Sequence, residues 1–244
     1  SIAGKLVCHD LDLVMRRGEC WGLLGSNGVG KTTLLHTLAG LRRADSGLIH
    51  LNGIPLYSLP RRDIARRLGV LLQEQLDPFP GTVLERILQG RHPHLGRWDW
   101  EGADDFALAD QALEQVGLRD LAGRQIATLS GGEKQRVAIA TLLTQAPDLY
   151  LLDEPVNHLD LHHQIALLDL LADKRNAAAS ALMMILHDIN LAARYCDHIL
   201  LLYGDGAIKA GPRHDILTRE NLSTLYQHEI LSFQGPHGPG FLPA

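Results

Sequence analysis

The sequence predicts an α/β fold: a mostly parallel sheet interrupted by a helical insert. The first observation is a set of short apolar runs, each followed by polar or glycine residues, as buried parallel strands require. These runs are residues 20–24, 70–72, 149–152, 182–186 and 199–202. The second observation is helical apolar spacing between residues 73 and 143, with candidate helices at 83–89, 106–116 and 132–143.

Composition and charge narrow the class of protein. The 244 residues suffice for one large domain, and 45% of them are hydrophobic, as in an ordinary globular protein. The net charge of -5 argues against nucleic acid as a partner. Cys8, Cys20 and Cys196 form no C-x-x-C pair, so a reducing cytoplasm is expected, without a disulfide framework or a zinc site. The longest apolar run, residues 177–186, is shorter than the about 20 residues of a membrane span.

A glycine-rich segment follows the first predicted strand and precedes helical spacing at residues 32–39, so the context suits a phosphate-binding loop. The segment that matches G-x-x-x-x-G-K-[ST] consists of Gly25, Ser26, Asn27, Gly28, Val29, Gly30, Lys31 and Thr32. Its backbone N–H groups would bind phosphate, Lys31 would reach the β- and γ-phosphates, and Thr32 would bind Mg²⁺. Thr33 could hydrogen-bond the α-phosphate. A glycine turn with a chance lysine is the competing interpretation.

Two carboxylates, Asp153 and Glu154, end the apolar run 149–152. A parallel strand would deliver them to the sheet edge where the glycine-rich loop also lies. Asp153 suits Mg²⁺ held through water, and Glu154 is placed to polarise an attacking water. An acidic pair that only caps a helix is the alternative.

A second anion cradle is predicted at Ser130, Gly131 and Gly132, which precede the helical run 132–143. The Ser130 hydroxyl, the backbone N–H groups and the helix dipole can bind a phosphate. The alternative is an ordinary capping box between Ser130 and Glu133. Because the chain has one P-loop and two cradles, one cradle would serve the nucleotide of another molecule.

The order of these motifs resembles the ATP-binding cassette family over nearly the whole chain. The resemblance adds Gln73, the segment 157–160 and His187. It implies ATP hydrolysis with Mg²⁺, in a homodimer that encloses two Mg-ATP. In this family Ser130, Gly131 and Gly132 would bind the γ-phosphate held by the opposite protomer. Gln73 would sense Mg²⁺ and water, Asp160 would cross the dimer interface, and His187 would contact the γ-phosphate. Glu133 replaces the more usual glutamine.

The resemblance implies one ABC ATPase domain, residues 1–244, with a P-loop NTPase core, an antiparallel β-subdomain and an inserted helical subdomain. The core would comprise 1–73 and 144–230, the helical subdomain 74–143, and the C-terminal tail 231–244. Apart from the resemblance, three prolines and three glycines within residues 235–244 predict a loosely held terminus. The family's adenine-stacking aromatic would fall near Ser1 or Ile2, where no aromatic residue stands. Either the sequence given begins inside the gene product, or an aliphatic contact replaces the stacking.

A transport ATPase is the expected system. A small-molecule P-loop kinase would not need the Ser130 cradle, and cassette proteins that act on DNA or ribosomes usually carry a coiled coil or a second cassette. The segments His187–Asp197 and Gly90–Pro93 look like the group that imports iron-siderophores, haem or cobalamin. Another importer, an exporter or a soluble cassette ATPase remains the alternative.

The partners implied are a transmembrane permease and, indirectly, a periplasmic substrate-binding protein, with the chain peripheral on the cytoplasmic face of the membrane. Phe79, Val83 and Ile87 are candidate permease contacts, since they follow Gln73 in the helical insert. The alternative is that these three side chains form the core of the insert.

Overall fold

A six-stranded sheet forms the centre of the computed structural model, which describes residues 6–73, 80–178, 180–235 and 238–244. The strand order is β4-β5-β6-β1-β7-β8. The first five of these are parallel and β8 runs antiparallel to β7. Their bounds are β1 Cys20–Gly25, β4 Leu68–Leu71, β5 Leu149–Asp153, β6 Ala181–Ile185, β7 His198–Leu202 and β8 Ile208–Pro212. The mostly parallel sheet expected from the apolar runs is therefore confirmed.

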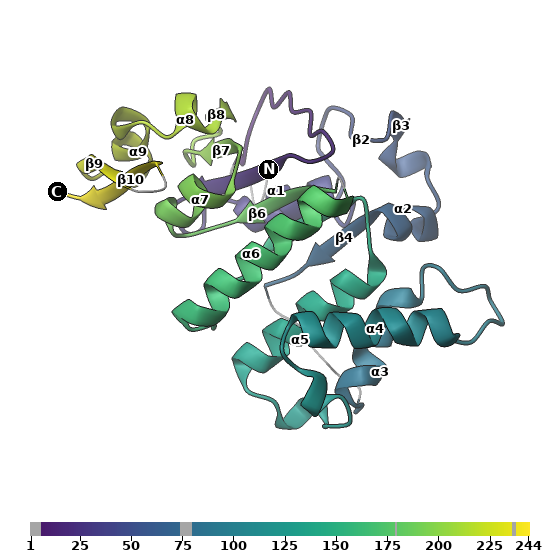
Figure 1. Ribbon diagram of the computed structural model, residues 1–244. Coiled ribbons are helices and arrows are strands. Elements are labelled where there is room, and N and C mark those ends of the chain that lie inside the picture. The colour runs from purple at the N-terminus through teal and green to yellow at the C-terminus, as the bar shows by residue number, and fades with distance from the viewer. Residues whose placement is uncertain (1–5, 74–79, 179, 236–237) are drawn as a thin grey trace.

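Helices surround this sheet, and two small hairpins lie apart from it (Figure 1). The helices are α1 Lys31–Leu38, α2 Arg61–Arg67, α3 Val83–Leu88, α4 Ala103–Gln115, α5 Gly131–Gln145, α6 Leu161–Ala178, α7 Ile189–Tyr195, α8 Arg213–Ile216 and α9 Arg219–Tyr226. The hairpins pair β2 His50–Leu51 with β3 Ile54–Pro55, and β9 Ile230–Gly235 with β10 Gly238–Pro243. The β2–β3 hairpin is antiparallel, as expected for that part of the core.

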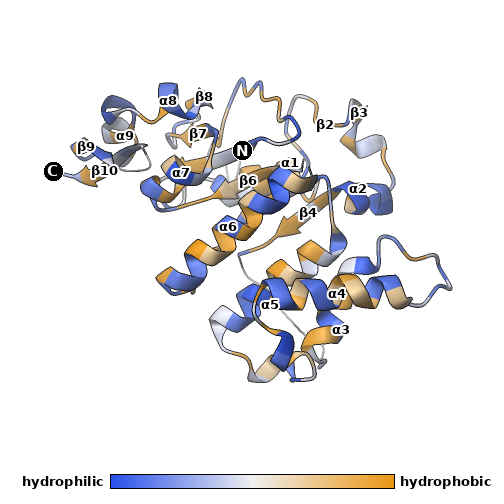
Figure 2. Ribbon diagram, in the orientation of Figure 1, coloured by the Kyte–Doolittle hydropathy of each residue, from blue (hydrophilic) through white to orange (hydrophobic). Residues whose placement is uncertain are grey.

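Burial of both sheet faces explains why the strands read as continuous apolar runs. All residues of β1 and β6 are buried, and β4 is drawn almost entirely in hydrophobic colours in Figure 2. The two faces belong to two hydrophobic clusters. Leu24, Leu152 and Met184 lie in the larger cluster, and Leu23 and Leu151 lie in the smaller one. The alternation of neighbouring strand residues between the clusters follows from the two-residue period of a strand.

The helical insert packs α3 and α4 against α5, which also contacts β4. Figure 1 shows these three helices grouped beyond the β4 edge of the sheet. Val83 and Ile87 of α3 are fully buried in the larger hydrophobic cluster. The prediction that they contact a permease is therefore wrong, because the apolar face of α3 is used to hold the insert together. Phe79, the third candidate, lies outside the described residues.

The C-terminal segment is not the loosely held tail that its prolines and glycines suggested. It forms the β9–β10 hairpin, and Phe241 of β10 is 4% exposed. The side-chain amide of Asn190 in α7 donates to the Phe241 carbonyl (3.1 Å) and accepts from the Phe241 N–H (2.8 Å). A buried aromatic ring and two hydrogen bonds outweigh the local preference of the segment for a turn.

Within the described ranges, none of the helices combines the length and the apolar character that a membrane crossing needs.

We expect Phe241→Ala to lower the free energy of unfolding by about 3 kcal/mol, the cost of emptying a buried aromatic site. Urea unfolding followed by circular dichroism measures this. Phe233→Ala on β9 is the matched control, because Phe233 is 48% exposed and its loss should cost at most about 1 kcal/mol. Equal losses for the two variants would contradict the docking of the hairpin through Phe241.

Candidate functional site

The carboxyl ends of four neighbouring parallel strands bring the predicted site residues together. The glycine-rich loop follows β1, Glu154 follows β5, and His187 follows β6. Gln73 lies two residues after β4. Since β4, β5, β6 and β1 are adjacent in the sheet, their ends share one edge, where α/β proteins place their ligand sites.

The loop between β1 and α1 has a backbone that only glycine adopts readily. Gly28 and Gly30 have φ values of 73° and 109°, in the left-handed region. Gly30 also lies so close to Val7 that an added Cβ would come within 2.8 Å of its side chain. Gly30 immediately precedes α1, whose first N–H groups are available for an anion.

The Lys31 ammonium group folds back onto this loop. Its Nζ donates to the carbonyl oxygens of Gly25 (2.7 Å) and Ser26 (3.0 Å), and the side chain is buried. Burial lowers the pKa of Lys31, while the negative charges of Glu154 and Asp153 act in the opposite direction. The loop therefore holds a buried cation next to N–H groups, which is a binding site for phosphate.

Asp153 has the features of a cation ligand. Its side chain is 1% exposed, and neither carboxylate oxygen makes a hydrogen bond of normal geometry within the described part of the chain. Burial raises the pKa of Asp153, and the nearby Thr32 hydroxyl lowers it to a smaller extent. A carboxylate and a hydroxyl are hard oxygen ligands, so these residues fit Mg²⁺.

Three side chains hold the Glu154 carboxylate. The Nε2 of His187 lies 2.6 Å from one oxygen, and the side-chain amides of Gln73 (3.3 Å) and Asn157 (3.1 Å) donate to the other. Glu154 itself has a φ of 51°, an unusual value for a residue other than glycine. The carboxylate is therefore fixed in orientation before any ligand is bound.

These groups face a cavity of about 480 Å³. It is lined by Asn27, Gly28, Gly30, Lys31, Thr32, Thr33, Gln73, Glu154 and His187. Six of these nine residues follow β1, β4, β5 or β6, and the other three, Lys31, Thr32 and Thr33, form the first turn of α1. Val29, which was also predicted in the loop, is not among these nine residues, and its side chain is buried in the smaller hydrophobic cluster.

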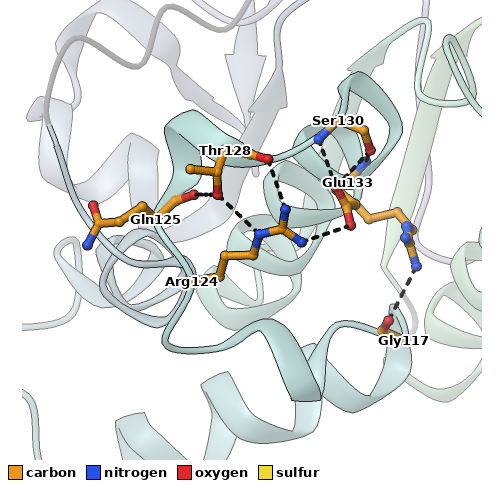
Figure 3. Close-up of polar contacts among 7 residues, drawn as sticks. Gly117, Arg124, Gln125, Thr128, Ser130 and Glu133 are labelled. Atoms are coloured by element: carbon orange, nitrogen blue, oxygen red, sulfur yellow. Dashed lines mark hydrogen bonds and ion pairs between the residues drawn. The ribbon is translucent and has the colours of Figure 1, made fainter.

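The second predicted cradle is not among the residues that line this cavity. Ser130 caps α5, and its N–H (2.7 Å) and hydroxyl (2.8 Å) both donate to Oε2 of Glu133, while the Glu133 N–H donates to the hydroxyl (Figure 3). The capping box considered as an alternative is thus present. A Cβ on Gly132 would approach the His158 carbonyl to 3.1 Å, so this position favours glycine.

Asp160, which was expected to cross the dimer interface, lies outside the cavity. Asp160 is exposed and accepts hydrogen bonds from the backbone and ring of His163, which lower its pKa. Like Ser130, it is not part of the cavity lining. The expected adenine platform near Ser1 and Ile2 lies outside the described residues.

Two polar residues near the site were not assigned from the sequence. Asn157, three residues after Glu154, bonds its carboxylate as described above. Gln135 of α5 donates from Nε2 to the backbone carbonyls of Glu154 (3.3 Å) and Pro155 (2.9 Å). The spacing from Glu154 could have indicated Asn157, whereas the contact of Gln135 depends on how α5 packs and has no local signal.

We expect Asp153→Asn to raise the Tm of the nucleotide-free protein by about 2–4 °C at neutral pH, corresponding to about 1 kcal/mol. The folded protein holds an unpaired, buried carboxylate with a raised pKa, so its stability falls as pH rises through that pKa. The gain should therefore shrink as pH falls through the same range.

Calorimetry in a chelating buffer measures this difference in Tm. Asp173→Asn, which removes an exposed carboxylate of α6, is the control and should move Tm by less than about 1 °C. A lower Tm for Asp153→Asn at neutral pH would show that Asp153 has a stabilising partner in the folded protein.

Comparison with known proteins gives the family. Residues 8–157 match the model of the ABC transporter family. The chain is 34% identical to the iron(3+)-hydroxamate import ATP-binding protein of Bacillus subtilis (strain 168), over 91% of this chain and 83% of that protein. It is 38% identical to the hemin import ATP-binding protein of Bordetella avium (strain 197N), over 98% and 93%.

Solved structures agree. A metal-chelate type ABC transporter in an inward-facing conformation superposes with a TM-score of 0.82 and 30% identity, covering 96% of this chain and 90% of that chain. A dimeric ATP-binding cassette in a post-hydrolysis state with ADP and Pi gives a TM-score of 0.74 and 26% identity, covering 85% and 90%. The chain therefore belongs to the ABC transporter family, as one of its ATPase subunits.

Proposed function

We propose that this ATPase hydrolyses Mg-ATP in two composite sites of a homodimer and thereby powers a separate permease that imports an iron chelate, haem or cobalamin. The observation that carries the proposal is one cavity lined by the P-loop, Glu154, Gln73 and His187, with the Ser130 cradle outside it. Each chain would complete the cavity of its partner.

Phosphate binding would use groups that already point into the cavity. The backbone of residues 25–30 and the first turn of α1 supply N–H groups, and Lys31 would exchange its loop carbonyls for the β- and γ-phosphates. Thr33 would bond the α-phosphate. Thr32, Asp153 and Gln73 would hold Mg²⁺, Asp153 through water, and the ion when bound would offset the charge of the phosphates.

Water activation would fall to Glu154. Its carboxylate accepts bonds from His187, Gln73 and Asn157, so it is oriented toward the cavity without cost at the moment of reaction. Glu154 would orient and polarise the attacking water, and His187 would contact the γ-phosphate. Phosphoryl transfer needs positioning of this kind more than covalent help from the protein.

The dimer supplies what one chain lacks. Ser130, Gly131 and Gly132 of one protomer would bind the γ-phosphate held by the P-loop of the other, with Asp160 crossing the interface. A two-fold axis satisfies both cradles in both chains. ATP would thus close the dimer, and loss of the γ-phosphate would open it again.

The transport assignment follows the names of the relatives, which import iron-hydroxamate and hemin. The protein would sit on the cytoplasmic face of the membrane and bind a permease, with a periplasmic binding protein delivering the cargo. Within the single cassette domain, segment 74–143 would act as a helical subdomain that moves against the core formed by 1–73 and 144–230. Gln73, the residue immediately before that segment, would couple the nucleotide state to this movement.

We expect Lys31→Ala to reduce ATP hydrolysis by at least about a hundredfold, because the lost charge acts in a buried site. Phosphate release by the purified protein measures the rate. Lys174→Ala, on α6 and outside the cavity lining, is the control and should retain activity. Hydrolysis that survives Lys31→Ala unchanged would place the activity in another site or another protein.

We expect Glu154→Gln to accumulate an ATP-bound dimer, since the substitution keeps the shape of the side chain and weakens its action on water. Sedimentation with and without ATP measures the dimer, and Ser130→Arg added to Glu154→Gln should abolish it by filling the cradle.

Mixed dimers separate the two cradles. A dimer of one Lys31→Ala chain and one Ser130→Arg chain has one site with both lesions and one with neither, so partial ATPase activity should return. Mixed dimers that form but stay inactive would contradict independent action of the two sites or the trans role of Ser130.

A further inference from the structure

Glu133 brings a negative charge to the place where the Ser130 cradle would receive a phosphate. Its Oε2 accepts both the hydroxyl and the N–H of Ser130, at 2.8 and 2.7 Å. Hydrogen bonds from Ser130, backbone first, hold the pKa of Glu133 below its ordinary value, so the side chain is an anion at neutral pH. A phosphate that accepts a hydrogen bond from the Ser130 hydroxyl must compete for it with the Glu133 carboxylate, which is also negatively charged.

Arg124 is the cation that meets this carboxylate (Figure 3). Its Nη1 lies 3.9 Å from Oε1 of Glu133, the oxygen that Ser130 does not use. Arg136 also lowers the pKa of Glu133, but less than Arg124, and its Nη1 donates to the backbone carbonyls of Val116 and Gly117.

The loop before α5 fixes the Arg124 guanidinium group in this position. Its Nε donates to the Thr128 hydroxyl (3.1 Å) and its Nη2 to the Thr128 carbonyl (3.2 Å). Thr128 in turn donates from its hydroxyl to the Gln125 carbonyl (2.7 Å). The Arg124 side chain is 46% exposed, but these hydrogen bonds hold its guanidinium group in one orientation.

We propose that Arg124 is a positioning residue of the cradle that each chain offers to its partner's nucleotide. It offsets the charge of Glu133 and retains that carboxylate when the Ser130 hydroxyl turns to a γ-phosphate. The inference rests on the proposed trans role of Ser130. It explains how a cassette with glutamate in place of the usual glutamine keeps an anion site beside an anionic side chain.

The test is a double-mutant cycle in the Glu154→Gln background, with ATP-dependent dimerisation measured by sedimentation. Glu133→Gln keeps the shape of the side chain and its capping box while removing the charge. Arg124→Gln should raise the ATP concentration for half-maximal dimerisation about tenfold when residue 133 is glutamate. With glutamine at 133, the same substitution should change it by less than about twofold.

Arg124→Lys distinguishes the contribution of the charge from that of the hydrogen bonds to Thr128, because lysine keeps the charge but cannot form both bonds. It should dimerise at an ATP concentration closer to that of the parent than to that of Arg124→Gln. Added salt should weaken the effect of Arg124→Gln, since exposed charges are screened. Thermal unfolding of each variant checks that it is folded, and Arg124→Met, which also removes the charge, replaces Arg124→Gln in the cycle should the glutamine variant fail that check.

Three results would overturn the inference. They are an unchanged ATP requirement for Arg124→Gln, an equal effect of it in both Glu133 backgrounds, and a lysine variant as impaired as the glutamine variant. The Ser130→Arg control separates this failure from failure of the proposed function. If Ser130→Arg does not block dimerisation, Ser130 is not the trans ligand. If Ser130→Arg does block dimerisation but Arg124→Gln has the same effect with glutamate and with glutamine at position 133, only the role of Arg124 is wrong.

Discussion

The parallel pairing of β5 with β6, and of β6 with β1, is the constraint on which the site depends. The registers place Asp153 beside Ile185 and Leu23 beside Ile185, so β5 and β6 end at the same level and β1 ends two residues beyond them. The P-loop, the Glu154 carboxylate and His187 can then share one cavity. A shift of one residue in β5 would turn Asp153 toward the opposite face of the sheet. Burial of both faces excludes that shift, because it would expose apolar side chains or bury a charge in the wrong cluster.

Much of this could be read from the sequence, for a physical reason. Parallel strands covered on both faces are continuous apolar runs, and the glycine-rich loop requires φ values that few residues other than glycine adopt. The five parallel strands were therefore located within about two residues of their observed bounds. Glu154 could be placed near the loop because it follows a strand of the parallel sheet, whereas Gln73 and His187 were indicated only by the resemblance to the ATP-binding cassette family.

Contacts between distant segments could not be read in this way. The C-terminal segment looks unstructured by composition, yet Asn190 and the burial of Phe241 order it from 51 residues away in the chain. Val83 and Ile87 carry an apolar pattern that suits either a docking face or a core, and only the position of α5 decides for the core. The sequence did not indicate Arg124 either, because the proposed role of Arg124 depends on its contact with Oε1 of Glu133, the oxygen that Ser130 does not bond.

The two hydrogen bonds of Gln135 connect α5, which starts at the Ser130 cradle, to the backbone at Glu154. The helix begins at the cradle that a chain would offer to its partner, and Gln135, on its second turn, donates to the backbone carbonyls of Glu154 and Pro155. In the proposed dimer, a displacement of α5 by the partner's nucleotide would therefore be passed along the helix to the backbone of the chain's own Glu154, which has a positive φ. The same would hold in the reverse direction around the two-fold axis. A rearrangement at one of the two sites would thus act on the other.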